Sequence, residues 1–244
     1  SAGVTTRLWF QLDRGGDFKE MLGYAVDSED WFTIRAAQDR RVLGDEGAKL
    51  WQTVEGAGVL GTYNLPILGG HKRQERVAEM EVRASKVTFH LCDRRTPSGW
   101  RDVTLSAVLT RERGTPPPGE ERIEWLLLTT APCNNFADAC RVVAGYAQRW
   151  RVEQFHKTWK STCRVEENEL RSPEPIKKWA TISAAVAMRI ERLTRLARTS
   201  PELPATAELT QAEIDAVILL KKPAGCRRGD IPSIASAVRW IADL

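Results

Sequence analysis

The chain has 244 residues, of which 42% are hydrophobic and 28% are charged, and its formal net charge is +4. This composition is ordinary for a globular protein, and the length allows one large domain or two to three smaller ones. No apolar run approaches the ~20 residues of a membrane helix, so no membrane partner is expected. The five cysteines are scattered and form no CxxC pair. This argues against a zinc site or a disulfide framework and favours the cytoplasm.

The start of the chain predicts a strand, a turn, a helix and a second strand. Val4 to Leu12 is rich in β-favouring residues and runs into an acidic, Gly-containing turn that begins at Asp13. A site residue is often found where a strand ends in such a turn, although Asp13 also fits a plain turn or cap position. Residues 18–26 predict a short helix with Asp17 as its N-cap, and residues 31–35 predict the second strand.

The middle of the chain predicts antiparallel β-structure. Four short runs with alternating apolar residues are separated by Gly, Pro and charged residues, and they cover 59–63, 77–82, 86–91 and 103–109. They indicate a β-rich insertion. The run Ile123–Thr130 is almost continuously apolar, which predicts a buried central strand.

The rest of the chain predicts helices. Either Asn134 or Asn135 is suited to cap a helix over 137–148, and Gly145 is a candidate break before the residues that follow. Further helices are predicted over 176–198, over 211–220 with Thr210 as the cap, and over 234–241.

The most informative stretch is 146–160, YAQRWRVEQFHKTWK. Read as a helix with about 100° per residue, it places one carboxylate among cations and a phenol on an arc of about 60° that holds Tyr146, Arg149, Glu153 and Lys160. The apolar residues on a separate arc predict a buried stripe of Val152, Phe155 and Trp159. A carboxylate can hold a metal and cations can hold phosphates, so the pattern suits a metal-dependent phosphodiester site. The same spacing also fits a plain i,i+4 helix pair worth a few tenths of a kcal/mol.

The four-residue pattern, with spacings of three, four and seven residues, matches the Y-R-E-K signature of IS4-type DDE transposases, most closely the Tn5 branch. The segment 13–17 resembles the turn that carries the second catalytic Asp of that family, and residues 32–35 resemble the strand that follows. Residues 124–129 resemble the strand that closes the family's β insertion, and residues 209–213 and 237–242 resemble its C-terminal region. The resemblance therefore covers nearly the whole chain in order.

This resemblance implies an α/β fold with an RNase H-like core that is incomplete at the N-terminus, an antiparallel β insertion and a helical C-terminal region. The implied domains are a first part of the core over 1–40, the β-rich insertion over 41–120, a second part of the core with the Y-R-E-K helix over 121–200, and a helical interaction region over 201–244.

The resemblance also implies roles for individual residues. Asp13 and Glu153 correspond to catalytic carboxylates that bind Mg²⁺ (or Mn²⁺). The DNA-binding positions are Tyr146, Arg149 and Lys160 in the signature, with Lys157 and Arg35 as further phosphate contacts and Trp125 as a stacking surface for a flipped base. Trp125 equally fits a core position and Arg35 a solvated charge. The implied partners are double-stranded transposon-end DNA and a second copy of the chain, in a bacterial, nucleoid-associated setting.

The chain departs from the family pattern in one respect. The family's first catalytic Asp lies on an earlier strand, whereas no acidic residue precedes Asp13 here. We therefore expect that this chain alone does not cleave DNA. Two functions remain open: a catalytic-core portion of a transposase that cleaves and transfers DNA strands at transposon ends, or a catalytically incomplete DNA-binding or dimerising fragment that regulates transposition.

Overall fold

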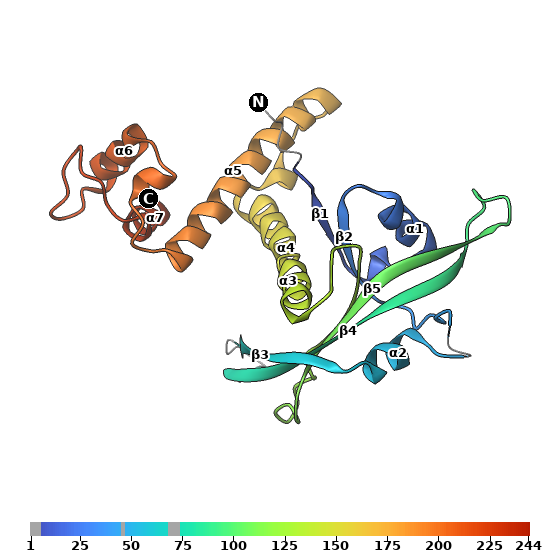
Figure 1. Cartoon of the computed structure of the whole chain (residues 1–244). Helices are drawn as coiled ribbons and strands as arrows, with labels where there is room; N and C mark the ends of the chain where they lie inside the picture. The colour runs from blue at the N-terminus through green and yellow to red at the C-terminus, as the bar shows by residue number, and fades with distance from the viewer. Residues whose placement is uncertain (1–5, 45–46, 68–73) are drawn as a thin grey trace, which may run out of the picture. The chain divides into compact units, whose positions relative to one another are not determined.

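The structure is a computed structural model that describes residues 6–44, 47–67 and 74–244 (Figure 1). The chain divides into two compact units, unit 1 (Ser1–Arg149) and unit 2 (Trp150–Leu244), and each is described by itself. Within the described ranges, none of the helices combines the length and apolar character needed to span a bilayer.

Unit 1 is built on one six-stranded sheet with the order β1-β2-β6-β5-β4-β3. Its strands are β1 (Trp9–Leu12), β2 (Trp31–Arg35), β3 (Val59–Ile67), β4 (Arg76–Cys92), β5 (Trp100–Glu112) and β6 (Glu124–Thr129). Only β1 and β2 pair in parallel, and the other neighbouring strands pair antiparallel. The helical elements of unit 1 are the 3-10 turn η1 (Arg14–Gly16), α1 (Lys19–Asp27), α2 (Leu50–Gly56) and α3 (Phe136–Ala147).

Local patterns predicted several of these elements well. The strand β2 has the predicted bounds, β6 is the predicted central strand, and Asn135 caps α3 by accepting a hydrogen bond from the Asp138 backbone. The runs 77–82 and 86–91 are not separate strands, because β4 pairs with β5 without interruption from Met80 to Cys92. Residues 4 and 5 of the predicted first strand lie outside the described residues. The short helix α2 was not predicted.

The predicted β insertion is continuous with the core sheet rather than a separate sheet. The strand β5 pairs with β6 over six residues, and β4 and β3 extend the sheet from there. Figure 1 shows the long β4 and β5 strands running well beyond the short β1 and β2. The strands β3, β4 and β5 therefore belong to the same sheet as the strands that carry the candidate site, and β4 and β5 share a hydrophobic core with them.

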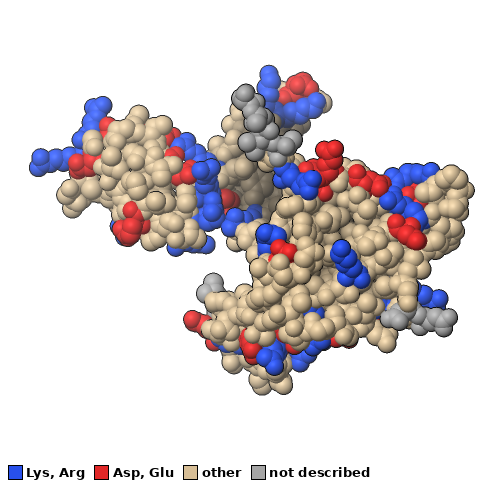
Figure 2. All heavy atoms as spheres, viewed as in Figure 1, with Lys and Arg blue, Asp and Glu red and all other residues tan. Residues whose placement is uncertain are grey.

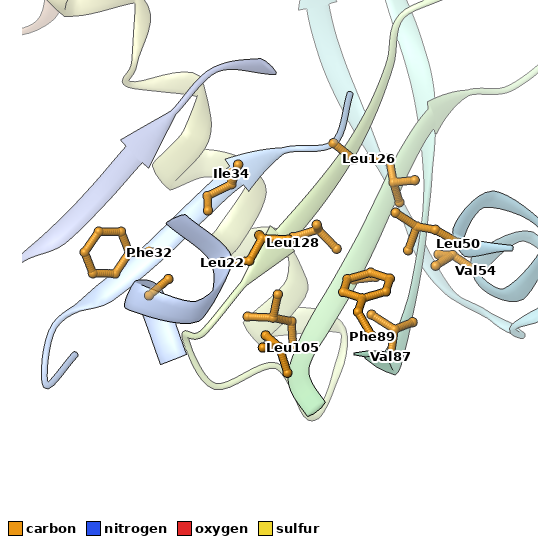
Figure 3. Packing of buried hydrophobic residues seen from close by; sticks show 14 of the residues in the cluster. Leu22, Phe32, Ile34, Leu50, Val54, Val87, Phe89, Leu105, Leu126 and Leu128 are labelled. Atoms are coloured by element: carbon orange, nitrogen blue, oxygen red, sulfur yellow. The ribbon is translucent and has the colours of Figure 1, made fainter. Parts of the chain in front are cut away.

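Both faces of the sheet are covered by helices. On the first, the α1 face, sheet residues such as Phe32, Leu105 and Leu128 pack against α1 and α2 (Figure 3). On the opposite face, called the α3 face, Leu127, Val82 and Val108 pack against α3. Because side chains alternate between the faces of a strand, consecutive residues of β6 enter different cores.

A buried hydrogen-bond chain ties together three strands on the α3 face. The Trp9 indole Nε1 donates to Thr33 Oγ1 at 2.9 Å, and the Thr129 hydroxyl donates to the Phe32 carbonyl oxygen at 2.8 Å. The two threonine hydroxyls lie 3.0 Å apart. Since a hydroxyl has one proton, Thr33 must be the donor to Thr129. This orientation satisfies both hydroxyls and joins β1, β2 and β6.

Unit 2 is helical. Its elements are α4 (Trp150–Lys157), a π-helical segment (Thr158–Thr162), a 3-10 turn (Val165–Glu167), α5 (Pro173–Thr199), a second 3-10 turn (Ala205–Ala207), α6 (Gln211–Lys221) and α7 (Ile234–Ala242). The helix α5 starts with Pro173, which suits a first helical turn because its missing N–H has no partner there. Thr210 caps α6 as predicted, in a reciprocal capping box with Glu213. A small core joins the second 3-10 turn, α6 and α7, and α5 packs against it through Leu193.

The stretch 146–160 does not form a single helix. The helix α3 continues through Gly145 and ends at Ala147, where two i→i−3 hydrogen bonds tighten the last turn, and α4 begins at Trp150. Gly145 is not the break. It lets α3 approach β1 closely, because a Cβ there would lie 3.3 Å from Gln11 Nε2. The predicted buried stripe is not fully buried. Val152 is 55% exposed, whereas Phe155 and Trp159 are half-buried.

Gly61 of β3 is a position where α3 packs closely on the sheet. A Cβ at residue 61 would lie 2.8 Å from the Phe136 ring. We therefore expect Gly61→Ala to lower the free energy of unfolding by about 1–3 kcal/mol, the usual cost of overpacking. Denaturant titration of the whole chain measures this loss.

Gly58→Ala is the matched control, because no atom lies within 4 Å of the added methyl group. Its effect should stay within about 0.5 kcal/mol, as for other exposed substitutions. Equal losses in the two variants would contradict the close approach of Phe136 to Gly61.

Candidate metal and DNA site

Asp13 occupies the turn that directly follows β1. Its Oδ1 accepts a hydrogen bond from the Gly15 backbone nitrogen at 2.9 Å and caps η1. The backbone of Asp13 is still extended, with φ −77° and ψ −168°, so the alternation of Trp9 and Gln11 continues to its side chain. Asp13 therefore belongs to the α3 face. Its carboxylate is exposed, and none of the described residues donates to Oδ2.

Asp17 anchors the turn that carries Asp13. Its side chain is fully buried, its Oδ2 accepts hydrogen bonds from the Ala37 and Gln38 backbone nitrogens at 2.6 and 2.9 Å, and Oδ1 forms an ion pair with Arg40. Arg40 also donates to the Asp17 carbonyl oxygen at 2.9 Å. The prediction that Asp17 caps α1 was wrong, because Phe18 is the N-cap and makes no side-chain cap. Asp17 instead fixes the Asp13 turn to the loop after β2.

Arg35 and Trp125 lie on the same face of the sheet as Asp13. Arg35 is the last residue of β2 and pairs in register with Leu127, a member of the α3-face core. Its Nη2 donates to the Glu124 carbonyl oxygen at 3.3 Å, which leaves further guanidinium donors for a ligand. Trp125 precedes Leu127 by two residues on β6, so it shares that face, and it is half-buried.

Tyr146 packs inside unit 1. Its side chain is 2% exposed, and its ring meets Trp125 edge-on, with centroids 5.1 Å apart and an angle of 74°. The Arg149 guanidinium lies 6.0 Å from the centroid of the Tyr146 ring, the outer limit of a cation–π contact. The α3 face thus holds the five predicted site residues of unit 1, namely Asp13, Arg35, Trp125, Tyr146 and Arg149.

The other three predicted residues belong to unit 2. Glu153 and Lys157 are exposed and lie one helical turn apart on α4. Lys160 lies in the π-helical segment, where it is 54% exposed and pairs with Glu166 at 2.7 Å. Because a π turn holds more residues than an α turn, the α-helical spacing does not describe the direction of Lys160.

The donor set suits a divalent cation of the hard class. In the described residues, no group of three or more His, Cys, Asp or Glu side chains is placed to hold a metal. Asp13 in unit 1 and Glu153 in unit 2 each offer carboxylate oxygens, the ligands that Mg²⁺ and Mn²⁺ prefer. Mg²⁺ commonly takes only one or two carboxylates and completes its shell with water and phosphate oxygens, so each of these carboxylates taken by itself is of the ligand type that such an ion uses.

An α/β fold with a mixed sheet and helices on both of its faces is compatible with the RNase H-like class of DNA-processing domains. A family model described as a transposase DDE domain matches residues 27–189, which is more than half of the chain. The chain therefore belongs to the transposase DDE domain family. Membership in this family implies DNA as a partner. The matched span contains every predicted site residue except Asp13.

The buried pair of Asp17 and Arg40 gives a stability test of the Asp13 turn. Asp17→Asn removes the charge but keeps the size, and it leaves an Arg40 side chain that is only 11% exposed without its counterion. We expect the free energy of unfolding to fall by about 3–5 kcal/mol, as is usual when one partner of a buried pair is removed. Denaturant titration provides the measurement.

Glu20→Gln is the control, because Glu20 is 67% exposed and its contact with Lys19 spans 3.7 Å. That surface pair should contribute less than about 1 kcal/mol. A loss for Asp17→Asn as small as that of Glu20→Gln would show that the buried pair does not hold the turn.

Proposed function

We propose that the chain is the catalytic-core portion of a DNA transposase of the IS4 type, closest to the Tn5 branch. In this proposal it takes part in metal-dependent phosphodiester cleavage and strand transfer at transposon ends. Family membership and the Y-R-E-K spacing support the assignment. The observation that carries it is the exposed Asp13 carboxylate, held at the carboxyl end of β1 by the buried Asp17 anchor.

The proposed metal ligands are Asp13 and Glu153, and the proposed ion is Mg²⁺ (or Mn²⁺). A bound divalent ion supplies Lewis-acid polarisation of the phosphate and lowers the pKa of a bound water. The proposed phosphate contacts are Arg35, Arg149, Lys157 and Lys160. Arginine suits this task because its planar guanidinium can bind two phosphate oxygens at once.

The packing of Trp125 on Tyr146 suggests how the two aromatic residues divide their work. Tyr146 is buried, whereas Trp125 is only half-buried. We assign the stacking contact with a base to Trp125 and a supporting role to Tyr146, since base–aromatic stacking needs only an exposed ring face. The proposed substrate is double-stranded transposon-end DNA, bound by two copies of the chain on paired ends.

The metal assignment can be tested by calorimetric titration with Mn²⁺. Glu153→Gln removes a proposed ligand at constant size, and we expect the Mn²⁺ affinity to fall at least about tenfold. Glu169→Gln is the matched control, because Glu169 is an exposed acidic residue of the same unit. The Mn²⁺ affinity of the Glu169→Gln variant should equal that of the unmodified chain. If the two variants bind Mn²⁺ equally well, Glu153 is not a ligand.

One observation favours the alternative, a DNA-binding or dimerising fragment that regulates transposition. The family match starts at residue 27, so the assignment of Asp13 depends on the strand-and-turn resemblance alone. Because this chain alone is not expected to cleave DNA, metal binding separates the two functions better than cleavage does. Mn²⁺ binding that depends on Glu153 supports the catalytic-core role, whereas binding of labelled transposon-end duplex without Glu153-dependent Mn²⁺ binding supports the regulatory one.

A further inference from the structure

Unit 2 contains a groove between the α4–π segment and the C-terminal half of α5. Its volume is about 1120 Å³; residues 151–162 contribute one wall and residues 188–199, with Glu208, the other. The walls are tied together, because the Trp159 indole donates to Ser183 Oγ at 2.8 Å and Thr158 Oγ1 donates to Glu191. The groove is therefore a feature of unit 2 alone.

The lining of the groove is rich in cations. Six basic and two acidic residues contribute to it, and they are Arg151, Lys157, Arg189, Arg192, Arg195, Arg198, Glu191 and Glu208. Both carboxylates already have partners in unit 2. Glu191 accepts the Thr158 hydrogen bond, and Glu208 pairs with Arg192 at 2.7 Å. The lining therefore offers an excess of positive charge that its own acids do not neutralise.

Four of these cations have no counterion among the residues that the structure describes. Arg189 pairs with Glu213 at 2.8 Å, so two of the six cations are compensated. Across the described part of the chain, no ion pair or hydrogen bond involves the side chains of the remaining four, which are Arg151, Lys157, Arg195 and Arg198. Elsewhere basic side chains commonly lie among acidic ones (Figure 2). Like charges around one groove repel each other, and a bound polyanion would relieve that repulsion.

The groove also presents apolar surface between its cations. Val152 and Met188 are 55% and 64% exposed, and the half-buried ring of Phe155 stacks on Trp159 with centroids 5.8 Å apart. A basic groove interleaved with apolar and aromatic side chains is the usual surface for single-stranded nucleic acid. A duplex presents only the edges of its bases, inside its grooves, so it offers no free base faces to such a surface.

We propose that this groove binds the phosphodiester backbone of a single DNA strand, with Arg195 and Arg198 on one wall and Arg151 and Lys157 on the other. The proposal depends on the proposed function for its source of DNA. It adds a binding surface on α5, whose arginines at 195 and 198 are outside the Y-R-E-K signature. Local strand separation at a transposon end would supply such a strand.

The test is the salt dependence of binding to a single-stranded oligonucleotide. Each phosphate contact contributes about 0.7 to the slope of log affinity against log salt concentration for a single strand. Arg195→Gln/Arg198→Gln should therefore reduce the slope by about 1.4 and weaken binding at moderate salt. Lys157→Gln on the opposite wall should remove about a further 0.7. Circular dichroism identifies any variant that has lost its helices.

Arg171→Gln/Lys178→Gln is the matched control. Both residues are exposed in unit 2, have no ion pair among the described residues and lie outside the groove, so the variant loses the same charge elsewhere. Its slope should stay at that of the unmodified chain. Equal slopes for the groove variant and this control would overturn the proposal.

A duplex of the same sequence completes the experiment. The groove variant should lose less slope on the duplex than on the single strand, and an equal loss would overturn the assignment to a single strand. Failure of the groove proposal is separable from failure of the proposed function. If Mn²⁺ binding depends on Glu153 but the groove variants keep the salt slope of the unmodified chain, the groove proposal alone is rejected. If the chain binds no DNA at all, the groove proposal and the proposed function are both rejected.

Discussion

Burial of β6 on both faces is the constraint on which unit 1 depends. Leu126 and Leu128 enter the α1-face core while Leu127 enters the α3-face core, and all three are at most 1% exposed. At about 1.5–3 kcal/mol for a fully buried leucine, the three contribute roughly 5–9 kcal/mol. This is comparable with the whole net stability of a domain. Since β6 pairs with both β2 and β5, it also joins the short strands to the long ones.

The candidate site follows from this strand. Leu127 packs against α3, and in the same core the Tyr146 ring of α3 contacts Trp125. The hydrogen bond between the Thr33 and Thr129 hydroxyl groups joins β2 to β6. Because β1 and β2 pair in parallel, Asp13 and Arg35 both lie at the carboxyl ends of these two strands. The Asp17 anchor holds these ends in place with a buried ion pair and backbone hydrogen bonds. The positions of the exposed site residues are therefore set by groups that are themselves buried.

Elements with a local signal were predictable from the sequence, and those decided by distant contacts were not. The apolar run of β6, the Asn135 cap and the Thr210 capping box each involve residues close together in the chain. The role of Asp17 depends on Arg40, 23 residues away, and the end of α3 after Ala147 does not coincide with Gly145, the residue that local propensity favours as a break. The signature residues could be named from their spacing, but their division between two units could not.

The arginines of α5 recur every three residues, from Arg189 to Arg198. This spacing could not predict the groove, because it does not show which arginines have an acidic partner. The structure makes that distinction through Glu213. The hydrogen bond from Arg189, followed by the bonds to Thr210, lowers the pKa of Glu213 to about 2. A lowered pKa means that the pair stabilises the fold above the ordinary pKa of the carboxyl group and is lost only as the pH falls towards 2. Near neutral pH Arg189 therefore stays compensated while Arg195 and Arg198 remain available. Salt concentration should therefore control what the groove binds, because dissolved ions screen the attraction between these side chains and phosphate groups.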